Sequence, residues 1–178
     1  MEETITVEKL TKTYGQKKAV NNLNLSAKRG SAFALLGENG AGKSTAIECI
    51  LGTKKADSGK VSVLGDNPAA DRKARCEKVG VQFQESHYQE KITVSELCEV
   101  TASLYPRTAK SECLLEKFEI LDKLKSPLEE LSGGQKLRLS VVLALLPEPE
   151  EVFLDELTTG LDTKTRRAVW KTLSQLKE

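Results

Sequence analysis

Residues 31–45 read SAFALLGENGAGKST, and the prediction of the fold starts from this stretch. Its first part, Ser31–Leu36, is a short apolar run of the kind that forms a fully buried strand. Gly37–Ser44 then matches the pattern G-x-x-x-x-G-K-[ST], whose glycines let the backbone turn so that N–H groups point at phosphate oxygens. A predicted helix over Lys43–Leu51 follows, and Gly52 ends it. Since the positive end of a helix attracts anions, this order of elements predicts a phosphate-binding loop.

Two side chains of this loop carry the expected chemistry. Lys43 is placed to reach the β- and γ-phosphates of a nucleotide, and the hydroxyl of Ser44 is a ligand for Mg²⁺. Chance is the alternative, but ordinary residue frequencies produce this pattern in well under roughly 1% of chains this long. The predicted nucleotide-binding residues here are Gly37, Glu38, Asn39, Gly40, Ala41, Gly42, Lys43, Ser44 and Thr45.

Two carboxylates follow another apolar run. Val152–Leu154 predicts a buried strand, and Asp155 and Glu156 come directly after it. In an enzyme with a phosphate loop, an Asp at such a strand end holds Mg²⁺, and the next carboxylate deprotonates the attacking water. A strand that simply ends in solvated acids is the alternative, which the complete phosphate loop makes weaker. We therefore predict that Asp155 binds the metal and that Glu156 is catalytic.

Composition excludes several classes of protein. The 178 residues suit one domain, and 27 Lys and Arg against 26 Asp and Glu give a net charge of +1, which argues against a nucleic-acid-binding tail. The longest unbroken apolar run, Val141–Leu146, is far shorter than the roughly 20 residues of a membrane span. The acidic N-terminus does not resemble a secretory signal, so the 4 cysteines are expected to be free thiols in a reducing cytosol.

The remaining pattern predicts an α/β core interrupted by helices. Residues 85–146 read mostly helical, Thr93 and Glu96 have the spacing of a capping box, and a last helix begins near Thr163. The other predicted strands are Ile5–Leu10, Val20–Ala27, a short one at Val61 and Val63, and Val79–Phe83.

Leu131–Gln135 reads LSGGQ and precedes an apolar helix that runs to about Leu146. Ser132 and Gln135 fit a capping box, and two glycines between them leave N–H groups uncovered at a positive helix end, which favours an anion. From these residues alone, an ordinary capped helix is the alternative. LSGGQ is, however, the signature of ATP-binding cassette (ABC) ATPases. With the phosphate loop and the acidic pair in the expected order, the chain resembles an ABC transporter nucleotide-binding domain from Tyr14 to the last helix.

The resemblance implies a fold, a function and partners. The fold would be α/β, with a P-loop NTPase core sheet, an antiparallel N-terminal β-subdomain and a helical insertion. A single domain would span residues 1–178, with 1–84 and 147–178 as core and 85–146 as insertion. The function would be hydrolysis of ATP with Mg²⁺ to drive membrane transport, at the cytoplasmic face of the membrane. The partners would be a membrane-spanning subunit and a second cassette, identical or paralogous, in a head-to-tail dimer.

The resemblance also assigns roles to residues. Tyr14 would stack on adenine, although a surface strand tyrosine is the alternative. Gln84 would contact Mg²⁺ or the attacking water, whereas Gln82 reads as a strand residue. Asp162 would face the partner cassette, or cap the last helix. The LSGGQ residues that would bind the ATP of the partner are Ser132, Gly133, Gly134 and Gln135. The stretches Val81–Tyr105 and Arg166–Trp170 look most like bacterial export-type members, which include drug exporters.

Two departures from the family pattern bear on catalysis. Leu157 stands where the family usually has a proline after the catalytic Glu, which leaves Glu156 less restricted. The switch histidine and its strand are missing, and His87 lies on the wrong side of the helical insertion to replace it. The chain is thus expected to be C-terminally truncated. A truncated module that binds ATP with little or no hydrolysis is one alternative, and a soluble ABC ATPase of DNA repair or translation is another.

Overall fold

The computed structural model describes residues 2–68, 70, 77–82, 91–155 and 163–175. The chain divides into two compact units, Met1–Arg75 and Cys76–Glu178, which we call unit 1 and unit 2. Five residues singled out from the sequence lie outside the described residues: Gln84, His87, Glu156, Leu157 and Asp162.

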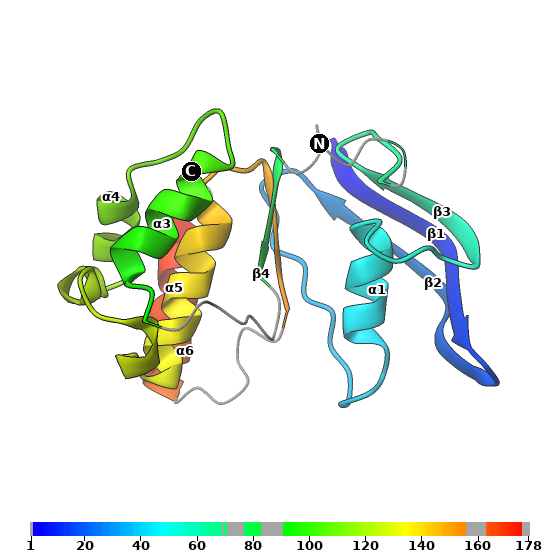
Figure 1. Cartoon of the computed structure of the whole chain (residues 1–178). Helices are drawn as coiled ribbons and strands as arrows, with labels where there is room; N and C mark the ends of the chain where they lie inside the picture. The colour runs from blue at the N-terminus through cyan, green and yellow to red at the C-terminus, as the bar shows by residue number, and fades with distance from the viewer. Residues whose placement is uncertain (1, 69, 71–76, 83–90, 156–162, 176–178) are drawn as a thin grey trace. The chain divides into compact units, whose positions relative to one another are not determined.

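Unit 1 is built on a three-stranded antiparallel sheet. Its strands are β1 (Glu3–Tyr14), β2 (Lys17–Lys28) and β3 (Ser58–Val63), in the order β2-β1-β3. The helix α1 (Lys43–Ile50) packs against all three strands (Figure 1). The predicted N-terminal strands, the predicted helix and the antiparallel N-terminal β-subdomain are therefore confirmed, with strands longer than the apolar pattern alone indicated.

The predicted buried strand Ser31–Leu36 is wrong for this structure. These residues have no regular secondary structure, and the side chains of Phe33 and Leu36 are 53% and 88% exposed. The segment begins with a tight turn, in which the N–H of Ser31 donates to the carbonyl of Lys28 at 3.0 Å. An apolar run becomes a strand only beside a partner that shares its ladder of hydrogen bonds. Among the described residues of unit 1, the three strands pair only with one another, so this run has no such partner there.

Unit 2 contains a two-stranded parallel sheet. The strand β4 (Val79–Gln82) pairs in register with β5 (Glu151–Leu154), as the sequence indicated for both segments. The predicted strand over Val152–Leu154 is confirmed, but its residues are half-buried rather than buried. Gly80 lies so close to the helix α5 (Gly133–Leu145) that a β-carbon would overlap the carbonyl oxygen of Ala144, which explains the glycine in this strand.

Helices connect the two strands of unit 2, and another helix follows them (Figure 1). Residues 91–146 are mostly helical, which confirms the prediction for the described part of the insertion. The elements are α3 (Val94–Ser103), α4 (Ser111–Lys117), the 3₁₀ turns η1 (Leu121–Lys123) and η2 (Leu128–Glu130), α5 (Gly133–Leu145) and α6 (Thr163–Gln175). Among the described residues, none of the helices combines the length and hydrophobicity needed to cross a bilayer.

Local capping and a shared core stabilise these helices. The predicted capping box at α3 is confirmed, since the Thr93 hydroxyl accepts from the N–H of Glu96 and the Glu96 carboxylate accepts from the N–H of Thr93. The core of unit 2 joins the faces of α3, α4, α5 and α6, with Leu115, Val142 and Val169 almost fully buried. Cys98 lies in the same core, and burial raises the pKa of its thiol to about 11, so it stays protonated.

Candidate functional site

The phosphate loop of unit 1 is closed by its own lysine. The ammonium group of Lys43 donates to the carbonyl oxygens of Gly37 at 2.9 Å and of Glu38 at 2.8 Å. The N–H of Ala41 donates to the carbonyl of Glu38 at 3.1 Å, which makes the loop a tight turn. The ammonium group of Lys43, the one positively charged side chain of the motif, thus lies across the loop, at the start of α1.

The start of α1 leaves its N–H groups available to an anion. The N-cap residue Gly42 makes no side-chain cap hydrogen bond, and the first turn of the helix carries no acidic residue. Ser44 and Thr45 are half-buried in that first turn. Uncapped amides together with the positive end of the helix dipole attract a phosphate group. The predicted loop residues from Gly37 to Thr45 are therefore brought together at one end of α1.

Gly42 is required by the close approach of another strand. Its φ of +90° lies in the left-handed region, and a β-carbon at this position would overlap the carbonyl oxygen of Ala19. Ala19 belongs to β2, so the sheet and the phosphate loop touch at this point. The glycine is thus needed by the packing of unit 1 as well as by the turn of the loop.

We expect Gly42→Ala to lower the free energy of unfolding by about 2 kcal/mol or more, because it adds left-handed strain and a backbone overlap. Urea titration would measure this loss. Gly40→Ala is the matched control, since Gly40 also has a positive φ, +79°, but a β-carbon there meets no atom within 4 Å. Gly40→Ala adds the backbone strain without the overlap, so it is expected to lower the free energy of unfolding less than Gly42→Ala does. Equal losses in the two variants would contradict the role of Ala19.

Asp155 lies at the carboxyl edge of the parallel sheet in unit 2. Its side chain is buried, with 6% exposed, and its N–H donates to the carbonyl of Gln82 at 3.0 Å. Gln82 is the last residue of β4, as the sequence indicated, and it is also buried. Because parallel strands end at the same edge, Gln82 and Asp155 lie next to each other at that edge. The predicted site residues Gln84 and Glu156 follow these strands but lie outside the described residues.

The LSGGQ segment begins α5 with the predicted capping box. The hydroxyl of Ser132 accepts from the N–H of Gln135 at 3.3 Å, and the side-chain oxygen of Gln135 accepts from the N–H of Ser132 at 2.9 Å. Ser132 and Gly133 are exposed, and a β-carbon added at Gly133 would meet no atom within 4 Å. Gln135 therefore fixes the turn through its oxygen, while Ser132, Gly133 and Gly134 form the open end of the helix.

Tyr14 ends β1, and its side chain is 45% exposed. Two ammonium groups lie close to its ring, that of Lys12 at 5.6 Å and that of Lys54 at 5.8 Å from the ring centroid. The sequence did not single out either lysine. The spacing of Lys12 and Tyr14, two positions apart in a strand, could have indicated that they share a face. No local pattern points to Lys54, which comes from the segment after α1.

The chain is similar to known proteins over most of its length. It matches the family described as "ABC transporter" over residues 20–159. It is 35% identical to Nod factor export ATP-binding protein I of Ralstonia nicotianae, over 97% of this chain and 55% of that protein. It is 33% identical to a daunorubicin resistance ATP-binding protein of Streptomyces coeruleorubidus, over 97% of this chain and 56% of that protein. The chain thus spans about half the length of these relatives.

The fold is also that of solved ATP-binding cassettes. One of them is the dimeric structure of a post-hydrolysis state bound to ADP and phosphate. It is 28% identical to this chain, with a TM-score of 0.84, and the match covers 98% of this chain and 83% of that one. The α/β architecture predicted from the sequence, with its P-loop NTPase fold, is thereby confirmed.

Proposed function

This chain belongs to the ABC transporter family, and from that premise we propose that it hydrolyses ATP as the nucleotide-binding subunit of a membrane transporter. The observation that carries this proposal is the phosphate loop, where Lys43 lies across the turn and Gly42 permits close packing. Residues 1–84 and 147–178 would form the core of one cassette domain, and residues 85–146 its helical insertion.

Magnesium binding fits the donors that the chain offers. The hydroxyl of Ser44 and the carboxylate of Asp155 are hard oxygen ligands, and Mg²⁺ takes few protein ligands beside phosphate oxygens. Among the described residues, no three His, Cys, Asp or Glu side chains gather into a metal-binding cluster. Gln84 would supply a further oxygen. The ion would neutralise charge on the phosphates during transfer.

The chain's own residues would bind the nucleotide and activate the attacking water. The loop amides and Lys43 bind and orient the phosphates, and Tyr14 stacks on the adenine, where an aromatic face adds affinity without reading the base edge. Glu156 accepts a proton from the attacking water. We propose that Ser132, Gly133 and Gly134 meet the γ-phosphate bound to a second cassette, since the positive end of a helix stabilises negative charge and the capping box leaves Gly133 exposed. Gln135 holds that helix end in shape.

Gly133→Asp should weaken the ATP-dependent pairing of cassettes. The structure has room for the side chain, and an acid in the first turn of a helix is stabilising, so the variant should fold. Its carboxylate would repel the γ-phosphate of the partner, and like charges at an interface cost several kcal/mol, so dimers should weaken at least about tenfold. Analytical ultracentrifugation with ATP would measure this. Gly133→Asn is the control of equal size, and equal dimerisation of the two variants would contradict the proposal.

We propose export as the transport direction, with a membrane-spanning subunit as partner and the cytoplasmic face of the membrane as the location. The relatives named for Nod factor export and daunorubicin resistance support this class. The test of the proposed function is calorimetric titration of the chain with ATP and Mg²⁺. Saturable binding of one ATP per chain is expected. No saturable binding would contradict the function.

A further inference from the structure

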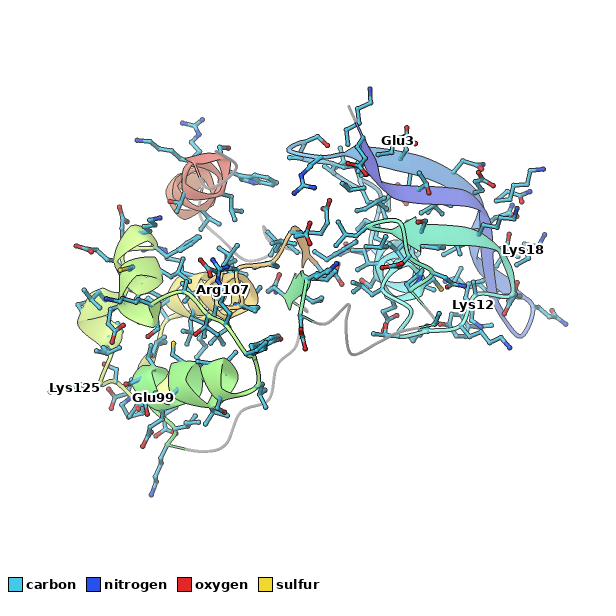
Figure 2. The ribbon with its side chains drawn as sticks, turned by 90° about the horizontal axis from the view of Figure 1, so that it is seen from above. Glu3, Lys12, Lys18, Glu99, Arg107 and Lys125 are labelled. Atoms are coloured by element: carbon cyan, nitrogen blue, oxygen red, sulfur yellow. The ribbon has the colours of Figure 1, made fainter. Side chains whose placement is uncertain are left out.

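The ring of Tyr14 is the centre of a small cluster of charges in unit 1. Lys12, labelled in Figure 2, comes from β1, and Lys54 comes from the segment after α1. Their ammonium groups lie 5.6 Å and 5.8 Å from the ring centroid, within the range of cation–π attraction. Two lysines about forty positions apart in the sequence thus lie close to one aromatic side chain.

A carboxylate holds each ammonium group in place. Lys12 pairs with Asp57 at 2.9 Å, and Lys54 pairs with Glu48 at 2.8 Å. Asp57 also accepts from the N–H of Thr13 at 2.7 Å, so it anchors the backbone beside Tyr14. The hydrogen bonds to Asp57 and Glu48 raise the pKa of Lys12 and of Lys54 above the ordinary lysine value. Both lysines therefore stay charged at neutral pH.

The Lys54 and Glu48 side chains are 45% and 27% exposed, and ion pairs this exposed contribute little to stability. The pair does, however, connect two places that a nucleotide would touch. Glu48 belongs to α1, the helix that begins at the phosphate loop, and Lys54 contacts the ring of Tyr14.

We infer that Lys54 is a positioning residue for the base of a bound nucleotide, acting through the ring of Tyr14. The inference rests on the proposed function. A ring held by a nearby cation before the base arrives loses less freedom on binding, which strengthens stacking. The ring is still 45% exposed, which leaves surface for a purine. Lys12 supports the same ring from its own strand.

The test compares two ligands of the full chain, ATP and inorganic tripolyphosphate, each with Mg²⁺. Because the base is missing from tripolyphosphate, Lys54→Met should weaken ATP binding about two- to fivefold and leave tripolyphosphate binding unchanged. Lys54→Arg should keep the affinity for ATP, since a guanidinium group also binds an aromatic face. Lys55→Met removes an equal charge from the next residue and is the matched control, expected to bind both ligands as the parent chain does.

A double-mutant cycle with Tyr14→Ala shows whether Lys54 acts through the ring. Once the ring is absent, Lys54→Met should have no further effect on ATP binding. Equal weakening for ATP and tripolyphosphate, additive effects in the cycle, or no change in Lys54→Met would each overturn the inference. If the parent chain itself did not bind ATP, the proposed function would fail instead, so the two failures are distinguishable.

Discussion

Replacing Lys43 by methionine is expected to weaken ATP binding at least about tenfold, and up to about a hundredfold. A hydrogen bond to a charged group contributes about 1.5–3 kcal/mol, and this side chain is expected to make such bonds to phosphate oxygens. The substitution also removes the two bonds, at 2.9 Å and 2.8 Å, that join the ammonium to the carbonyls of Gly37 and Glu38. The loop would then lose both its contact to the phosphates and the two hydrogen bonds that hold its turn. Calorimetric titration with ATP measures the change.

The control for this prediction is Lys18→Met, on β2 of the same unit (Figure 2). It removes one positive charge and leaves the phosphate loop intact, so its affinity for ATP should equal that of the parent chain. Methionine keeps the length of the lysine stem in both variants, and only the ammonium group differs. Equal affinity of the Lys43 and Lys18 variants would show that the loop does not bind the phosphates in the proposed way.

Replacing Glu156 by glutamine should abolish turnover while ATP still binds. Glutamine has nearly the same shape but cannot accept a proton from water, and loss of general-base catalysis slows a reaction about 10²- to 10⁴-fold. The contacts proposed for the phosphates come from the loop and from Lys43, so affinity should change little. Phosphate formed in an acid-quenched single turnover measures the chemical step directly, apart from product release.

Glu151→Gln is the matched control, because Glu151 begins the strand β5 whose far end leads to Asp155. It changes one carboxylate to an amide on the same strand and should turn over ATP as the parent chain does. If the Glu156 variant hydrolysed ATP at the rate of the parent chain, another group would have to be the general base that deprotonates the water. Turnover that fell together with ATP affinity would indicate a binding defect rather than a catalytic one.

Features fixed by neighbouring residues were predictable from the sequence. The capping boxes at Thr93 and Ser132 follow from a hydroxyl and a Glu or Gln three positions later, and both form as expected. The phosphate loop is equally local, since glycines and a lysine at fixed spacing determine its turn. These elements depend on few long-range contacts, so a pattern of a few residues is enough to identify them.

Features that depend on distant partners were not predictable. The run Ser31–Leu36 has the composition of a buried strand, but composition does not say which strand would pair with it. Lys54 approaches Tyr14 because α1 packs on the sheet, and no sequence spacing encodes that contact. The overlap that Gly42 avoids is with Ala19, which also lies far from it in the sequence. The roles of Gln84 and Glu156 stay predictions.

The account is tested most directly by the steady-state release of phosphate from ATP and Mg²⁺, measured over a range of chain concentrations. If an active site is completed by the LSGGQ helix of a second cassette, turnover per chain should rise with concentration as dimers form. It should be lost in the Lys43 and Glu156 variants and weakened in Gly133→Asp. ATP binding without turnover at any concentration, or turnover unaffected by these three substitutions, would contradict the account.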